Sequence, residues 1–241
     1  MPQESIHEGN KILAVNKDYV SEFVYGGIDG AITTFAVVAG AAGANAEIKW
    51  VLIFGFANLI ADGFSMSVGN FFSTKADRDN FEKHKAIEYW EVENLTEKEV
   101  EEIREIYAAK GFKGELLEQV VEVITSDKDV WVDTMMKEEL EMVKDTRTPV
   151  QTAMATFLSF MAVGLIPLLS YIVAALAPID QTNLFLFSCL GTGVGLLIVG
   201  YLKSQITSES TIKSIGQTLL LGGIAAALAY YVGEVLAIYL L

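Results

Sequence analysis

The sequence of 241 residues has very few of the side chains that build the commonest protein metal centres. It contains one cysteine, Cys189, and two histidines, His7 and His84. A single cysteine excludes an intrachain disulfide and a thiolate zinc site, and two scattered histidines are too few for a histidine-based zinc site. EF-hand loops, Walker loops and nucleophile elbows are also missing from the sequence. We therefore expect no enzyme activity and no organic cofactor.

Basic residues are also in short supply. The chain has 17 Lys and Arg against 31 Asp and Glu, which gives a formal net charge of −14. Such a chain repels the phosphate backbone of nucleic acids and the surface of anionic lipids. The composition excludes nucleic acid as a partner and favours cations.

Charged residues are almost absent from five apolar stretches. Each is about 20 residues or longer, which is enough for a helix to cross the ~30 Å hydrocarbon core of a bilayer. The stretches cover residues 24–46, 49–72, 151–177, 183–202 and 216–241. The segment before the first stretch lacks the short basic start and small-residue cleavage site of a signal peptide, so we expect the first helix to remain. The sequence predicts an all-α protein held in the lipid bilayer by five transmembrane helices.

Charge is concentrated instead between Lys75 and Arg147. This segment holds 21 Asp and Glu and 12 Lys and Arg, a net charge of −9. We divide the chain accordingly into an N-terminal segment with two membrane helices (1–72), an acidic helical insert (73–148) and three further membrane helices (149–241).

Apolar residues three and four apart predict helices within the insert. Residues 73–90 are expected to extend the second membrane helix into water. Thr96 with Glu99 forms a capping box that opens a helix ending near Lys110. The remaining elements are a glycine-bracketed turn and two helices, at residues 111–114, 115–125 and 128–144.

Lysine and arginine are distributed unevenly among the loops. Sixteen of the 17 lie in the N-terminal segment, in the insert or in the loop after the fourth helix, and only Lys49 lies on the opposite side. By the positive-inside rule, the N-terminus and the insert are cytoplasmic and the C-terminus lies outside or in a lumen. The membrane is expected to be the plasma membrane in a prokaryote and the vacuolar membrane in a eukaryote.

Acidic residues interrupt the interior of two apolar stretches, Asp29 in the first and Asp62 in the second, while Glu234 lies near the end of the fifth. Asp29 and Asp62 each cost roughly 2.5–3.5 kcal/mol to insert unless they face water, a partner or an ion. Gly26, Gly27 and Gly30 thin the first helix beside Asp29 and are expected to leave room for water or an ion. For Asp62, a bond to a neighbouring helix remains the alternative explanation.

Polar side chains follow one face of each of these two helices, because successive helical residues are rotated by about 100°. The two stripes consist of Asp18, Glu22 and Asp29 on the first helix and Asn58, Asp62, Met66 and Asn70 on the second. Carboxylates alone would suit Mg²⁺ or Ca²⁺, whereas a thioether adds a soft donor that favours later divalent transition metals. We interpret the stripes as a path for such an ion, although Met66 alone also fits an ordinary core position.

Acidic residues also pair along the predicted helices of the insert. The residues in question are Glu88 with Glu91, Glu99 with Glu102, and Glu139 beside Met135 and Met136. Glutamates three residues apart project from one helix face and destabilise the helix slightly, an effect that a bound divalent cation would reverse. A solvated acidic face is the simpler explanation for any single pair.

Taken together, these features resemble the vacuolar iron transporter family, whose members are dimers with five membrane helices and a cytoplasmic metal-binding insert between helices two and three. The likeness extends from about Tyr19 to Ala237. Its most specific motifs are Gly26-Gly-Ile-Asp-Gly30, Ala61-Asp-Gly-Phe-Ser-Met-Ser-Val-Gly69, Ala155-Thr-Phe-Leu-Ser-Phe160, Gly164 to Pro167 and Trp131 to Glu139. The resemblance implies a homodimer that exchanges ferrous ion for protons, and some relatives handle manganese.

The resemblance also implies which residues bind metal. The insert ligands would be Glu88, Glu91, Glu99, Glu102, Met135, Met136 and Glu139, the translocation site would contain Asp29 and Met66, and its cytoplasmic entrance Asp18 and Glu22. Family members often carry a glutamate where this chain has Asn58, and Asn70 replaces the acid of a Gly-Glu pair. A carboxamide cannot alternate between charged and neutral forms, so proton coupling is an open question for this chain.

Three functions are compatible with the sequence. The first is export of Fe²⁺ from the cytoplasm by proton antiport. The second is transport of Mn²⁺, or of a broad range of divalent ions that includes Zn²⁺ and Co²⁺. The third is a membrane-anchored metal sensor or buffer that moves no ion.

Overall fold

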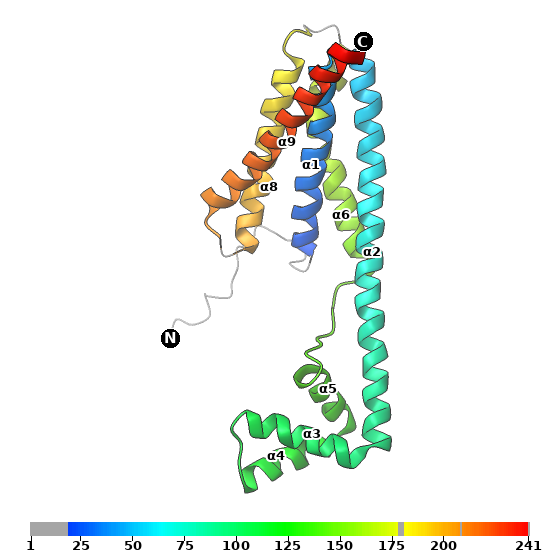
Figure 1. The fold of residues 1–241 in the computed structure, drawn as a ribbon, viewed down its shortest axis with the longest axis vertical. Coiled ribbons are helices and arrows are strands. Elements are labelled where there is room, and N and C mark those ends of the chain that lie inside the picture. Colours follow the sequence, from blue (N-terminus) through cyan, green and yellow to red (C-terminus); the bar gives the residue numbers. More distant parts are fainter. Residues whose placement is uncertain (1–18, 178–180, 208, 241) are drawn as a thin grey trace. The chain divides into compact units, whose positions relative to one another are not determined.

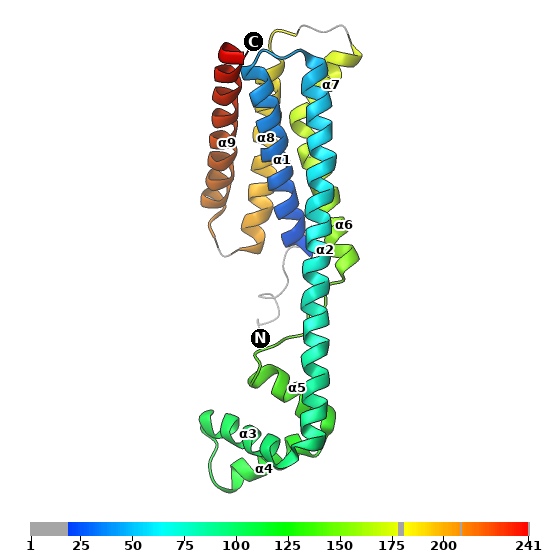
Figure 2. The same cartoon turned by 45° about the vertical axis from the view of Figure 1, so that its right-hand side comes forward.

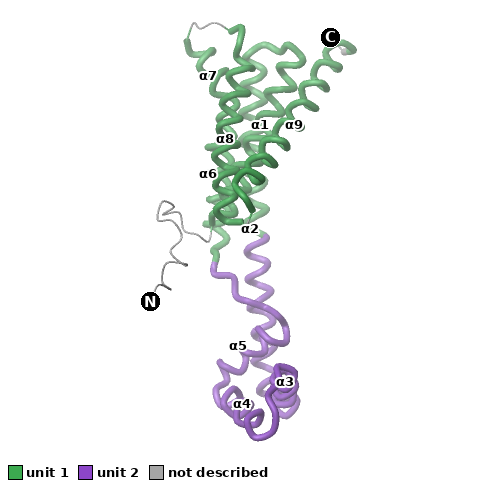
Figure 3. The backbone as a smooth tube through the Cα atoms, turned by 90° about the vertical axis from the view of Figure 1, so that its left-hand side faces the viewer, with its two compact units in different colours: residues 1–72, 147–241 green, residues 73–146 purple. Residues whose placement is uncertain are grey.

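The computed structural model describes residues 19–177, 181–207 and 209–240, and all regular elements within these ranges are helices. Residues 1–72 and 147–241 form one compact unit and residues 73–146 form another (Figure 3). Five helices are long and apolar enough to cross a membrane. The prediction of an all-α integral membrane protein is therefore confirmed.

The first unit is a helical bundle. Its long helices are α1 (Val20–Gly43), α2 (Ile48–Asn94), α6 (Pro149–Gly164), α8 (Leu184–Ile206) and α9 (Thr211–Leu240). Helix α2 continues past the boundary of the first unit, so that its C-terminal part belongs to the second unit. The predicted extension of the second membrane helix is therefore present.

The sequence predicts one continuous helix over the third apolar stretch, and this prediction is wrong. After α6, the chain forms a short 3₁₀ helix, η2 (Ile166–Leu168), and then α7 (Leu169–Leu176). Pro167 explains the break, because proline has no N–H to donate to the carbonyl of Val163 and its ring crowds that carbonyl.

Helix α1 is the central helix of the bundle and lies against α6, α8 and α9 (Figures 1 and 2). Glycines allow α6 to approach closely. A methyl group at Gly26 would lie 2.6 Å from the carbonyl oxygen of Thr156, and one at Gly30 would lie 2.5 Å from that of Phe160. The expectation that these glycines leave room for water or an ion is therefore wrong, because backbone from α6 fills the space beside them.

The contact between α1 and α9 also depends on glycine. A methyl group at Gly43 would collide with the carbonyl oxygen of Tyr230, and one at Gly233 would collide with that of Gly40. Small residues thus bring the backbones of α6 and α9 close to that of α1, which is how membrane helices commonly associate.

The second unit contains α3 (Thr96–Ala109), α4 (Glu115–Thr125) and α5 (Lys128–Glu138) together with the end of α2. These helices enclose a core in which Ile103, Val132, Met135 and Met136 are almost completely buried. Helix α4 has the bounds that the sequence predicts.

The predicted capping box at the start of α3 is wrong. The N-cap residue is Leu95, which makes no side-chain cap, and the Thr96 hydroxyl donates to the carbonyl oxygen of Val92 at 2.8 Å. Only Leu95 separates α2 from α3, so Thr96 still lies within one helical turn of the last residues of α2.

Helix α5 also ends earlier than predicted, at Glu138 instead of Lys144. The amide of Leu140 bonds back to the carbonyl of Met135 at 3.2 Å. Glu141 then adopts a left-handed backbone conformation with φ 52°, which stops the helix.

The close approach of α1 and α6 generates the first prediction. Gly30→Ala should destabilise the bundle by about 1–3 kcal/mol, because overpacking at a backbone contact forces the two helices apart. Gly193→Ala, in α8, is the matched control, since a methyl group there meets nothing within 4 Å. Thermal unfolding of the full-length protein in detergent measures both changes. Equal unfolding temperatures for the two variants would contradict this description of the packing.

Candidate metal sites in the bundle and the insert

The candidate site in the bundle centres on two half-buried carboxylates. Asp29 of α1 and Asp62 of α2 lie close enough to repel each other electrostatically. Met66, one turn beyond Asp62, is also half-buried. Two carboxylates with a thioether one helical turn away are a donor set of mixed hardness, which can accept a divalent transition-metal ion.

The two asparagines that flank Asp62 on α2 have different surroundings. The side-chain amide of Asn70 donates to the hydroxyl of Thr156 at 2.6 Å and so ties α2 to α6. The amide nitrogen of Asn58 is buried and has no hydrogen-bond partner. An unpaired buried donor is costly, so Asn58 is the one of the two that has capacity to bind water or a passing ligand.

At the N-terminal end of α1, Glu22 is engaged by other residues. Its Oε1 accepts from the guanidinium Nη1 of Arg147 at 2.6 Å, and its Oε2 accepts from the hydroxyl of Ser21 at 2.8 Å. The Glu22 side chain is only 8% exposed. Asp18, which the sequence groups with Glu22, lies outside the described residues.

The insert buries two of its glutamates. Glu88 of α2 is 3% exposed and Glu99 of α3 is 1% exposed, and one oxygen of each, Oε2, is buried without a hydrogen-bond partner. Buried carboxylate oxygens are normally satisfied by donors, so these two oxygens retain capacity to accept a hydrogen bond or to contact a cation.

The electrostatics of these glutamates show that they form one cluster. The pKa of Glu88 is raised to about 7, mainly by burial and to a smaller extent by the charges of Glu139, Glu91 and Glu102. Burial, followed by the charges of Glu102, Glu88 and Glu91, raises the pKa of Glu99 to about 7 as well. Burial and Glu102 also raise the pKa of Glu139. The structure therefore brings the five predicted glutamates into one electrostatic neighbourhood.

The carboxylates of the cluster are not arranged as a coordination sphere. In the parts of the chain that the structure describes, no three His, Cys, Asp or Glu side chains are positioned to hold one metal ion. Lys98 already interacts with the acidic groups, with its Nζ 2.7 Å from Glu102 Oε1 and 3.9 Å from Glu99 Oε1. A metal ion would have to draw the carboxylates together and displace this lysine.

Met135 and Met136 are adjacent in α5, and both are buried in the core of the insert at 0% and 1% exposure. Their sulfurs contribute to packing in this structure. Methionine is flexible and its thioether adapts readily to new surroundings, so either side chain can present sulfur to an ion after a rotamer change.

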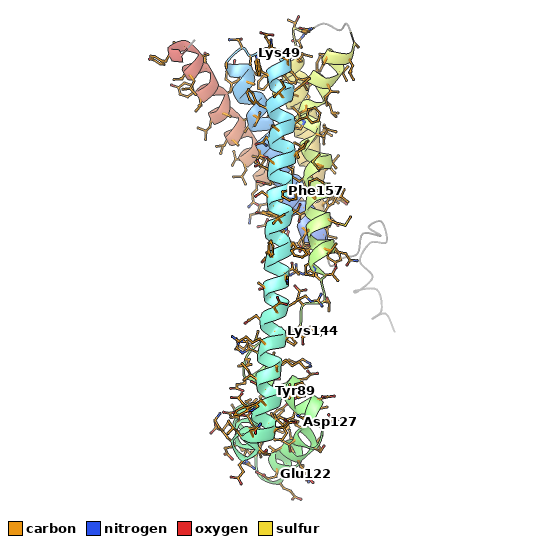
Figure 4. The ribbon with its side chains drawn as sticks, turned by 90° about the vertical axis from the view of Figure 1, so that its right-hand side faces the viewer. Lys49, Tyr89, Glu122, Asp127, Lys144 and Phe157 are labelled. Atoms are coloured by element: carbon orange, nitrogen blue, oxygen red, sulfur yellow. The ribbon has the colours of Figure 1, made fainter. Side chains whose placement is uncertain are left out.

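A row of polar contacts holds α5 against α2. Tyr89 of α2 donates its hydroxyl to Asp129 at 2.6 Å, and Lys85, one turn earlier, donates to Asp133 at 2.8 Å. Lys128 forms an ion pair with Glu93, one turn after Tyr89. Figure 4 labels Tyr89 on α2 and Asp127, the N-cap of α5. These contacts fix the helix that carries Met135 and Met136 next to the helix that carries Glu88.

Comparison with known proteins identifies the relatives of this chain. The model of the VIT family matches residues 20–234. The chain belongs to the VIT family. It is 37% identical over 227 residues to the vacuolar iron transporter of Toxoplasma gondii, an alignment that covers 92% of this chain and 75% of the relative.

Other members of the VIT family match over similar lengths. The vacuolar iron transporter of Plasmodium falciparum is 33% identical over 228 residues, covering 92% of this chain and 84% of the relative. Vacuolar iron transporter 1 of Arabidopsis thaliana is 30% identical over 219 residues, covering 90% and 86%. The similarity therefore includes both the membrane helices and the insert.

Sequence reasoning missed two residues of this VIT-family chain, Lys98 and Arg147. Lys98 places a positive charge on Glu102, which was predicted to bind metal, and Arg147 places one on Glu22, which was predicted to lie at the entrance of the ion path. Lys98 precedes Glu102 by four residues, a spacing at which a helical ion pair could have been predicted. Arg147 is 125 residues from Glu22, so no local pattern connects them.

The raised pKa values of Glu88 and Glu99 predict how the metal-free protein responds to pH. Both pKa values are about 7 in the folded state, against an ordinary value of 4.5. Between pH 4.5 and pH 7 the folded state therefore binds more protons than the unfolded state does. The contribution of these two carboxyls to stability should therefore be fully present below about pH 4.5 and be lost, by roughly a few kcal/mol, as pH rises to 7.5. Fluorescence of the buried Trp131 during denaturant unfolding of the full-length protein reports on this unit.

The matched variants are Glu99→Gln, which removes a buried charge, and Glu105→Gln, which removes an exposed one. We expect Glu99→Gln to raise stability at pH 7.5 without metal and Glu105→Gln to change it little. Added Mn²⁺ should stabilise the wild type at pH 7.5 more than at pH 5.5, because metal binds the deprotonated carboxylates. Metal-free stability that rises with pH across this range would show that the glutamates are not destabilised by burial.

Proposed function

We propose that this VIT-family chain is a transporter that exports Fe²⁺ from the cytoplasm in exchange for protons. The observation that carries the proposal is that Asp29 and Asp62 are half-buried carboxylates on two apolar helices and interact electrostatically, with Met66 one turn from Asp62. Two carboxylates in a bilayer are costly unless they face water, a partner or an ion, and such groups commonly mark the path of an ion or of protons. The relatives at 30–37% identity are named as vacuolar iron transporters, which supports iron as the substrate.

In the proposed mechanism, Asp29 and Asp62 compensate the charge of one divalent ion while Met66 supplies a soft donor. Protonation of Asp29 removes its negative charge and weakens its hold on the ion. A lower pH on the outer side would then release metal there and return protons to the cytoplasm. Because Asn58 and Asn70 cannot bind a proton in this way, proton exchange within the bundle falls to the carboxylates.

We propose that the insert collects the ion. Its glutamates repel one another, Glu88 and Glu99 each have one buried oxygen without a partner, and the pKa values of these two residues are raised to about 7. A divalent ion would relieve all three unfavourable features. The proposed ligands remain Glu88, Glu91, Glu99, Glu102, Met135, Met136 and Glu139.

The orientation follows from the distribution of basic residues. We propose that the N-terminus and the insert face the cytoplasm and that the C-terminus faces the outside or a lumen. We also propose a homodimer, on the basis of the family resemblance. In this arrangement the ion moves away from the compartment in which the insert collects it.

Reconstituted flux tests the assignment of the path. Asp29→Asn and Met66→Leu preserve side-chain size, and each should lower Fe²⁺ flux into proteoliposomes by at least about tenfold, because each removes a ligand. The matched controls are Glu234→Gln near the end of α9 and Met154→Leu on an exposed face of α6, which should keep wild-type flux. Wild-type flux in both path variants would overturn the assignment.

The same liposomes separate the proposal from its rivals. A transporter of Mn²⁺ or of many divalent ions would show strong inhibition of Fe²⁺ flux by equimolar Mn²⁺, Zn²⁺ or Co²⁺. A sensor or buffer would bind Fe²⁺ without carrying it into the vesicles. The proposal predicts Fe²⁺ entry that equimolar Mn²⁺ reduces only weakly.

A further inference from the structure

The contact between Arg147 and Glu22 has no place in the transport scheme above. If Glu22 guides metal ions at the entrance of the bundle, both of its oxygens should be available to a cation. Instead, Arg147 and Ser21 occupy one oxygen each. A metal ion that binds Glu22 must therefore first displace the guanidinium of Arg147.

The surrounding contacts place Arg147 at this position. Thr148, the next residue, is the N-cap of α6, and its backbone amide donates to the hydroxyl of Tyr19 at 3.1 Å. The Tyr19 hydroxyl in turn donates to Gln151 in the first turn of α6 at 2.6 Å. The backbone beside Arg147 is thus anchored to the residue that precedes α1, three positions before Glu22.

Burial makes the two partners unequal. The Glu22 side chain is 8% exposed, whereas that of Arg147 is 36% exposed. Glu22 therefore has little access to water of its own, while Arg147 has a route to solvent. Removing the guanidinium without replacement would leave a buried carboxylate uncompensated, which is strongly unfavourable. The pair can open only when another cation takes the place of the guanidinium.

The charge of the incoming cation decides whether this exchange is favourable. Attraction to a carboxylate scales with the charge of the cation at a given distance. A monovalent ion would replace one positive charge by another and lose the directed hydrogen bond of the guanidinium. A divalent ion doubles the attraction and can offset the loss of that bond.

We infer that Arg147 is a tethered cation that occupies Glu22 until a divalent ion displaces it, and that it thereby makes the entrance selective for divalent over monovalent cations. The inference rests on the proposed transport function, because it places Glu22, the entrance residue implied by the family resemblance, on the path of the ion. Arg147 is then a specificity-determining residue and not a ligand.

Kinetics of the full-length protein in proteoliposomes test this role. Arg147→Gln should lower the KM for Fe²⁺ several-fold and make flux sensitive to inhibition by Na⁺. Arg147→Lys retains the charge and should behave as wild type. In the background of Glu22→Gln, Arg147→Gln should have no further effect on KM. A pair that is only structural would give lower thermal stability in Arg147→Gln with unchanged KM and unchanged resistance to Na⁺, and that result would overturn the inference.

A second measurement uses the wild-type protein and does not depend on flux or on the folding of a variant. In detergent, modification of Arg147 by a dicarbonyl reagent is followed by mass spectrometry with Mn²⁺, with Na⁺ or without either. Displacement by a divalent ion predicts faster modification with Mn²⁺ only. Equal rates in all three conditions would refute the exchange. Faster modification with Mn²⁺ in a protein that shows no flux would support the exchange while refuting transport.

Discussion

A carboxylate removed from water must be compensated, and this constraint connects the functional features of the chain. Asp29 and Asp62 are half-buried on two apolar helices of the bundle. Glu22 is compensated by Arg147, whereas Glu88 and Glu99 are buried at pKa values of about 7, at which a proton is readily held and readily lost. A divalent cation near any of these carboxylates would lower the electrostatic cost of keeping it charged. Burial in an apolar framework is therefore what makes each of these carboxylates costly to keep charged and uncompensated.

The helices that hold these groups could be predicted largely from sequence, because the constraint on them is local in the chain. Apolar runs long enough to span a bilayer identify the membrane helices, and the bounds of α4 follow from its apolar spacing and a preceding glycine. The wrong predictions for individual helices also have local causes. Pro167 divides the third span, and the single residue between α2 and α3 keeps Thr96 from acting as a cap.

The functional sites could be predicted only in part. Acidic residues in apolar runs and glutamates three apart pointed to Asp29, Asp62, Glu88 and Glu99, because their cost or repulsion is visible in sequence. Contacts over long separations were not visible. The ion pair of Arg147 with Glu22 and the backbone of α6 against Gly30 depend on tertiary packing. Met135 and Met136 were assigned as ligands, yet their first role in the folded insert is to fill its core.

The central claim is that an ion crosses the membrane in exchange for protons along a carboxylate path in the bundle. The most direct measurement records internal Fe²⁺ and internal pH together in liposomes that contain the wild-type protein and an imposed pH gradient. The account predicts that Fe²⁺ accumulates on the acidic side and that the internal pH rises in proportion. Fe²⁺ that binds to the protein but never enters the vesicles, under either direction of the gradient, would contradict it.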